Sequence, residues 1–163
     1  MLQCAFYKIV RRFAMKKIVA IALCVAFVIC GVSGNDKVSI ESAKSAIKKA
    51  RDDYSTALNG YFNASITFVA LQKGLDDNVA KIAEVAKASQ NGKVEAQKVS
   101  KIMQRIQNLE AELQEAQSTK NPTKKYLALK DKFVALSDKS TNELIQSKAT
   151  LEDGIAIFRK YAK

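Results

Sequence analysis

The 163-residue chain contains no histidine, no tryptophan and only one proline. Without histidine it lacks the side chain that most often serves as a general base and as a metal ligand. All three cysteines (Cys4, Cys24 and Cys30) lie in residues 1–34, so the remainder has no thiol nucleophile and no thiolate ligand. A glycine-rich phosphate loop and a Gly-x-Ser-x-Gly nucleophile motif are also missing. These absences predict a protein that is not an enzyme and that holds no cofactor or metal ion.

Two adjacent aspartate pairs, Asp52-Asp53 and Asp76-Asp77, are the remaining candidates for acid–base chemistry. Neighbouring residues on a helix point about 100° apart, which is poor geometry for a shared proton. We therefore interpret Asp52-Asp53 as surface charge and Asp76-Asp77 as acidic residues at the start of a helix.

The first 34 residues have the order of a secretory signal. Lys16 and Lys17 precede an apolar run at residues 18–32, and Val32-Ser33-Gly34 supplies a cleavage site before the polar Asn35. The start lies either at Met1 or at Met15. The apolar run is 15 residues long, shorter than the about 20 residues of a spanning helix. We expect residues 1–34 to be removed and residues 35–163 to form one domain in the periplasm, on the cell surface or secreted.

Two other fates of the leader stay open. Val28-Ile29-Cys30-Gly31 resembles the bacterial lipoprotein box, which makes Cys30 a candidate lipidation site, although Ile29 is bulky where a small residue is usual. An uncleaved leader would instead hold the protein to the membrane. Either fate gives membrane contact, whereas cleavage after Gly34 leaves a domain without cysteine and thus without disulfides.

Residues 35–163 carry a heptad pattern and almost no strand signal. Apolar or small residues recur at steps of three and four from Ile40 to Leu75, and similar stripes follow in two later segments. Lys73-Gly74 and Asn121-Pro122 are the breaks between them. We predict helices at about 39–73, 76–118 and 122–162, with a kink or short break near 90–93, where the pattern changes phase at Asn91-Gly92.

Three rods of similar length joined by short loops predict an all-α fold, an antiparallel bundle of three long, coiled-coil-like helices. One continuous helix over 39–118 is the alternative, and it would leave half of its apolar stripe without a partner in a monomer. The alternative would therefore need a homo-oligomer, and we keep a homo-oligomer as a second possibility.

Two surfaces are candidates for binding. Removal of the leader leaves 22 basic against 16 acidic residues, and the excess is greatest in the third helix. There it could face an anionic ligand such as lipid head groups, an acidic glycan or an acidic protein. The first helix has an unusually wide apolar face that suits an oligomer interface or a membrane-seeking patch. The basic candidates are Lys124, Lys125, Lys130, Lys132 and Lys139, and the apolar candidates are Tyr61, Phe62, Ile66, Phe68 and Val69.

These features predict an exported interaction or structural module of the bacterial envelope or surface, such as an adhesin, an antigen or a scaffold. Its partner would be an unknown protein or an anionic surface ligand. Nucleic acid is a poor candidate, because export separates the protein from it and no aromatic stacking platform accompanies the lysines. A periplasmic holdase and a membrane-active helical protein are the alternatives.

Overall fold

The computed structural model describes residues 34–118 and 122–162, and nearly all of them are helical. The helices are α2 (Gly34–Lys73), α3 (Asp77–Ala80), α4 (Ala83–Gln117) and α5 (Pro122–Tyr161). The described residues contain no strand, and the predicted all-α fold class is confirmed. Residues 1–33 of the predicted signal segment (1–34), with Cys30, lie outside the described residues.

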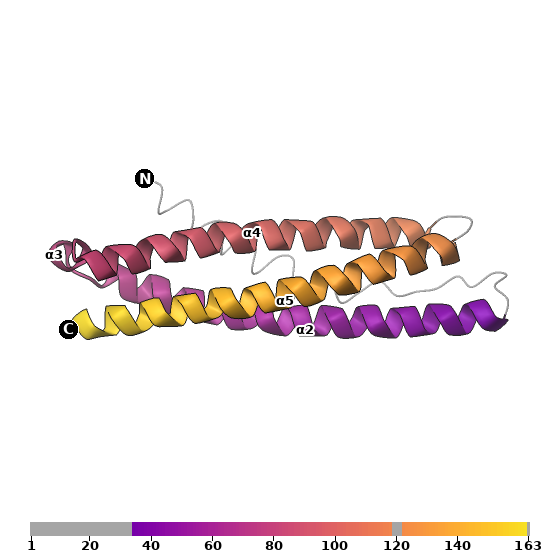
Figure 1. Cartoon of the computed structure of the whole chain (residues 1–163), viewed down its shortest axis with the longest axis horizontal. Helices are drawn as coiled ribbons and strands as arrows, with labels where there is room; N and C mark the ends of the chain where they lie inside the picture. Colours follow the sequence, from indigo (N-terminus) through magenta and orange to yellow (C-terminus); the bar gives the residue numbers. More distant parts are fainter. Residues whose placement is uncertain (1–33, 119–121, 163) are drawn as a thin grey trace. The chain divides into compact units, whose positions relative to one another are not determined.

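The three long helices form the predicted antiparallel bundle. α4 runs opposite to α2 and α5, and α5 packs along both of the other helices (Figure 1). The backbones of α2 and α4 approach each other less closely than either approaches α5. Side chains of α2 and α4 therefore have to span a wider gap.

Local sequence explains where the helices end. α2 ends at Lys73, as predicted, and the Gly74 N–H donates to the Leu71 carbonyl at 3.0 Å, which tightens the last turn. α5 begins at Pro122, where a residue without an N–H costs no hydrogen bond. α2 begins at Gly34, earlier than the predicted position near 39.

The second predicted helix is interrupted, but earlier in the chain than expected. Ile82 is extended (φ −62°, ψ 131°) and separates α3 from α4. Asn91 and Gly92, where the sequence predicts a kink or short break, lie inside α4, which continues across both.

The heptad pattern of α4 looks broken only because two of its core positions are not apolar. Gly92 is buried and Glu95 is half-buried, whereas Ala86, which the apolar pattern assigns to the core, is exposed. Once the glycine and the glutamate are counted, steps of three and four residues run without interruption along α4. The positions are Val85, Ala88, Gly92, Glu95, Val99, Ile102, Ile106, Leu109, Leu113 and Ala116.

The core combines aromatic side chains from α2 and α5 with smaller side chains from α4. Tyr54, Tyr61 and Phe68 of α2 are buried, as the heptad pattern predicts. The Phe68 ring contacts Phe158 of α5, with the ring centroids 4.8 Å apart. Serines occupy several buried positions of α5, namely Ser137, Ser140 and Ser147.

Phe68 lies between two helical glycines from different helices. A Cβ at Gly92 of α4 would lie 2.5 Å from the Phe68 ring, and one at Gly154 of α5 would also lie 2.5 Å from it. Because the ring is enclosed on both sides and is only 4% exposed, it cannot move away from one helix without approaching the other. These glycines allow α4 and α5 to close around one aromatic ring.

We predict that Gly92→Ala and Gly154→Ala each lower the free energy of unfolding by about 1–3 kcal/mol, because overpacking outweighs the helix propensity of alanine. Gly60→Ala is the matched control. Its Cβ would meet Lys148 at 3.6 Å, an ordinary contact, so this variant should gain up to about 1 kcal/mol. Urea unfolding followed by circular dichroism gives all three values. Equal stabilisation by all three substitutions would contradict the tight enclosure of Phe68.

Candidate functional site

Arg51 of α2 links all three helices. Its Nε lies 2.9 Å from Glu110 Oε1 of α4, and its guanidinium lies 5.8 Å from the centroid of the Phe133 ring of α5. The Glu110 side chain is only 16% exposed, so the pair is partly shielded from water and forms only in one register of α2 and α4. Burial and, to a smaller extent, the charge of Glu110 raise the pKa of Tyr54 to about 12.

Glu95 occupies a core position of α4 and makes a second polar contact between helices. The Ser147 hydroxyl of α5 donates to its carboxylate, and Lys98 Nζ lies 3.7 Å from the same oxygen. Burial and then the charge of Glu95 raise the pKa of Tyr61 to about 12, while a hydrogen bond with Ser65 acts in the opposite direction. The carboxylate thus has hydrogen-bonding and charged partners although it faces the core.

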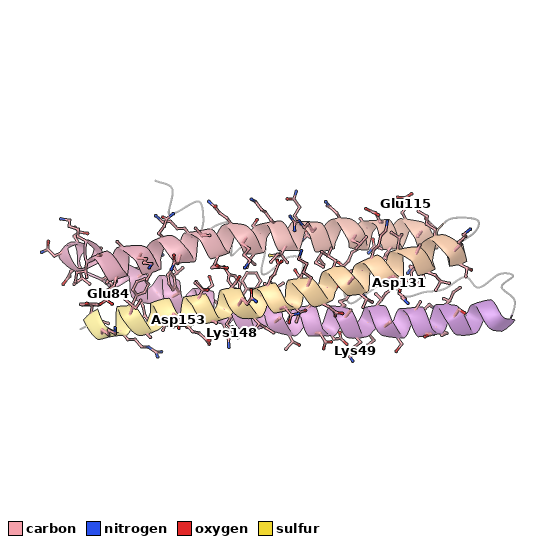
Figure 2. All side chains as sticks on the ribbon, viewed as in Figure 1. Lys49, Glu84, Glu115, Asp131, Lys148 and Asp153 are labelled. Atoms are coloured by element: carbon pink, nitrogen blue, oxygen red, sulfur yellow. The ribbon has the colours of Figure 1, made fainter. Side chains whose placement is uncertain are left out.

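Contacts at both ends complete the alignment of α4 with α5. The Tyr161 hydroxyl donates to Glu84 near α3, and this hydrogen bond is the main reason that the Tyr161 pKa is raised. Lys125 Nζ lies 3.2 Å from Glu115 Oε1 at the opposite end of the bundle. Figure 2 shows Glu84 and Glu115 at the two ends of α4. Together with Glu95–Ser147, these contacts determine which residues of α4 and α5 lie at the same level.

A groove of about 240 Å³ lies between α4 and α5, and we call it the basic groove. It has three basic side chains and one acidic side chain, so its charge is positive. Lys101 and Arg105 are exposed and Lys98 is half-buried. Its lining consists of Val94, Gln97, Lys98, Lys101, Ile102, Arg105 and Glu143.

The spacing along α4 places the three cations on one face. Lys98, Lys101 and Arg105 are three and four residues apart, so their side chains follow each other over about 10 Å of helix. Lys139 precedes Glu143 by one turn on α5 and therefore shares its face. Since Ser147 pairs with Glu95 and Lys125 with Glu115, Lys139 lies between these levels, opposite the middle of the groove.

The five lysines predicted as an anionic-partner surface do not all share one face of α5. Lys125, Lys132 and Lys139 recur every seven residues and follow the side of α5 that faces α4. Lys124, which directly precedes Lys125, is exposed. Lys130 is half-buried, and its Nζ lies 2.7 Å from Asp131 Oδ1. The structure therefore brings part of the predicted surface next to the basic groove.

The residues of α4 in this groove were missed by sequence reasoning, because the second helix was assessed by its whole charge, which is close to neutral. Within α4 the basic residues all precede position 106, and three of the five acidic residues follow position 109. Counting basic and acidic residues separately for each face and each half of the second helix would have revealed Lys98, Lys101 and Arg105.

The residues of the predicted apolar patch are divided between core and surface. Tyr61 and Phe68 are buried, Phe62 and Val69 are half-buried, and Ile66 is 64% exposed. In this bundle only Ile66 is a large exposed apolar side chain among the five, so the patch is not a continuous surface. A role for it in an oligomer or at a membrane stays a prediction.

Within residues 34–118 and 122–162, no group of three or more Cys, His, Asp or Glu side chains is placed to hold a metal ion. None of the helices described there combines the length and apolarity that crossing a membrane requires. Comparison of the chain with protein-family models, with curated proteins and with solved structures found no match.

The raised tyrosine pKa values predict a loss of stability at alkaline pH. Below pH 10 the Tyr54 and Tyr61 hydroxyls are protonated in both folded and unfolded chains, and their stabilising effect is fully present. Between about pH 10 and 12 the unfolded chain loses these protons while the folded chain keeps them, so the free energy of unfolding falls as pH rises. Two pKa units correspond to about 2–3 kcal/mol for each tyrosine. Unfolding curves at pH 9 to 12 measure this loss, and a double variant with Tyr54→Phe and Tyr61→Phe should show much less of it.

We also predict that Arg51→Ala costs about 1–3 kcal/mol of stability, because Glu110 is then left partly buried without its cation. Lys125→Ala removes a pair whose side chains are 49% and 69% exposed, so it should cost under about 1 kcal/mol. Thermal and urea unfolding of both variants provide the comparison. Equal costs would show that Arg51 acts as an ordinary surface residue.

Proposed function

We propose that the protein is an exported, non-enzymatic interaction module of the bacterial envelope or surface, acting as an adhesin, an antigen or a scaffold. The order of basic, apolar and small residues in the first 34 positions supports export. The antiparallel bundle supports a rigid rod that presents its side faces to a partner.

The basic groove is the observation that carries this proposal. Its three cations stand on α4, and the register of α4 against α5 is fixed by Glu95–Ser147 and Lys125–Glu115. Side chains held on packed helices lose less freedom on binding than those on loops, so such a face is suited to recognition. The positive charge favours an anionic partner and speeds its approach.

Membrane activity receives less support from the bundle than an interaction role does. In the predicted apolar patch of α2, Tyr61 and Phe68 belong to the core. A membrane could reach them only if the contact of Phe68 with Phe158 opened. The holdase alternative depends on an oligomer that encloses a cavity, so the oligomeric state measured by light scattering tests it.

Export is tested by producing the full chain in a bacterial host, separating cytoplasm, membranes and periplasm, and determining the mature N-terminus by mass spectrometry. We expect a protein outside the cytoplasm that begins at Asn35, and a lipid-modified Cys30 would support export with an anchor. A chain with its leader intact in the cytoplasm would overturn the proposal. A variant with Lys16→Glu and Lys17→Glu, which removes the basic residues before the apolar run, is the control and should be exported less.

A further inference from the structure

The basic groove is one of two recesses along α4 and α5, and we call the two together the channel. A second recess, of about 290 Å³, lies between the same two helices nearer α3. Its residues Lys87 and Asn91 continue, at steps of three and four, the row on α4 that Val94, Lys98 and Lys101 occupy. From Glu84 to Arg105 the two recesses follow about 30 Å of helix. The second recess is lined by Glu84, Lys87, Ala88, Asn91, Thr150, Asp153, Gly154 and Ile157.

Apolar side chains lie along this channel between the charged ones. Val94 is 50% exposed, which makes it one of three large apolar side chains exposed in the described bundle. Ile157, which lines the recess near α3, is half-buried, whereas Ile102 and Ala88 lie beneath the two recesses and are buried. A partner that lies in the channel therefore meets the apolar side chains of Val94 and Ile157 as well as charge.

Charge changes sign along the channel. The basic groove has Lys98, Lys101 and Arg105 against Glu143, whereas the recess near α3 has Glu84 and Asp153 against Lys87. Figure 2 shows Glu84 and Asp153 together near the α3 end. A uniform polyanion would be attracted by the first part and repelled by the second.

We propose that this channel docks an amphipathic α-helix of a partner protein, with acidic residues spaced three and four apart facing Lys98, Lys101 and Arg105. This inference rests on the proposed function and names the partner class. A helix fits a straight channel between two antiparallel helices, and its apolar stripe would cover Val94 and complete a four-helix arrangement. The first 34 residues carry five basic and no acidic residues, so the leader does not complement the groove.

The test uses the full chain and a synthetic 21-residue peptide with a leucine stripe, flanked by glutamates at helical spacing in the half that would face the basic groove and by lysines in the half that would face Glu84 and Asp153. Binding is followed by fluorescence anisotropy and peptide folding by circular dichroism. We expect the peptide to bind and become helical, and a peptide with lysine in place of each glutamate not to bind. The double substitution Lys101→Glu with Arg105→Glu should weaken binding at least about tenfold.

The matched control is Lys48→Glu with Lys49→Glu, which makes the same change of charge on exposed residues of α2. Figure 2 shows Lys49 on the side of α2 that faces away from α4. This control should leave peptide affinity within about twofold. Val94→Ser, which changes no charge, should weaken the binding of the helical peptide several-fold. It should leave the binding of unstructured poly-glutamate unchanged. Unfolding curves confirm that each variant remains folded.

Three results would overturn the proposal. Poly-glutamate, a sulfated polysaccharide or anionic vesicles binding as tightly as the peptide would show that the groove recognises charge alone. Self-association that is lost on Lys101→Glu with Arg105→Glu would identify a second copy of the chain as the occupant. Absence of peptide binding would exclude the helix partner, while export, measured separately, would still support or reject the proposed function.

Discussion

The bundle depends on a match of side-chain size around Phe68. The ring requires the space that a Cβ would occupy on both α4 and α5, and Gly92 and Gly154 provide it. Glycine within a helix costs up to about 1 kcal/mol against alanine. Two such residues facing one ring, which also contacts Phe158, are therefore better explained by packing than by local helix preference. Because α2 supplies the large group and its partners supply the space, the three helices can close only in the register that aligns these positions.

Polar contacts across the core reinforce that register. Arg51–Glu110 joins α2 to α4, and Glu95–Ser147 joins α4 to α5. Apolar heptads tolerate slippage by a whole heptad, whereas a partly buried carboxylate that slips loses its partner at a cost of about 1–3 kcal/mol. The same alignment sets the level of Lys139 beside the α4 cations. The basic groove is thus a consequence of contacts made in the core.

Much of the fold follows from sequence, because heptad spacing and the Asn121-Pro122 break are local signals. The stripe of α2 from Ala43 to Phe68 lies in the core as predicted. The predicted irregularity near Gly92 was misplaced because a glycine and a glutamate occupy core positions, and only the neighbouring helices show why: Phe68 needs the glycine and Ser147 binds the glutamate. The groove could be anticipated only in part. The lysines of α5 were visible, but their nearness to Lys101 and Arg105 depends on antiparallel register, which links residues distant in sequence.

The arrangement of charge in the groove supports the proposed binding role. Elsewhere the bundle pairs charges at helical spacing, as in Lys44–Glu41 and Lys148–Glu152. Lys98 is paired with Glu95 in the same way, but Lys101 and Arg105, four residues apart, repeat one sign, which destabilises a helix by about 0.2–0.5 kcal/mol. Within the part of the chain that the structure describes, neither Lys101 nor Arg105 forms an ion pair that would offset this repulsion. The proposed acidic partner would remove this repulsion on binding, and that relief would add to its affinity.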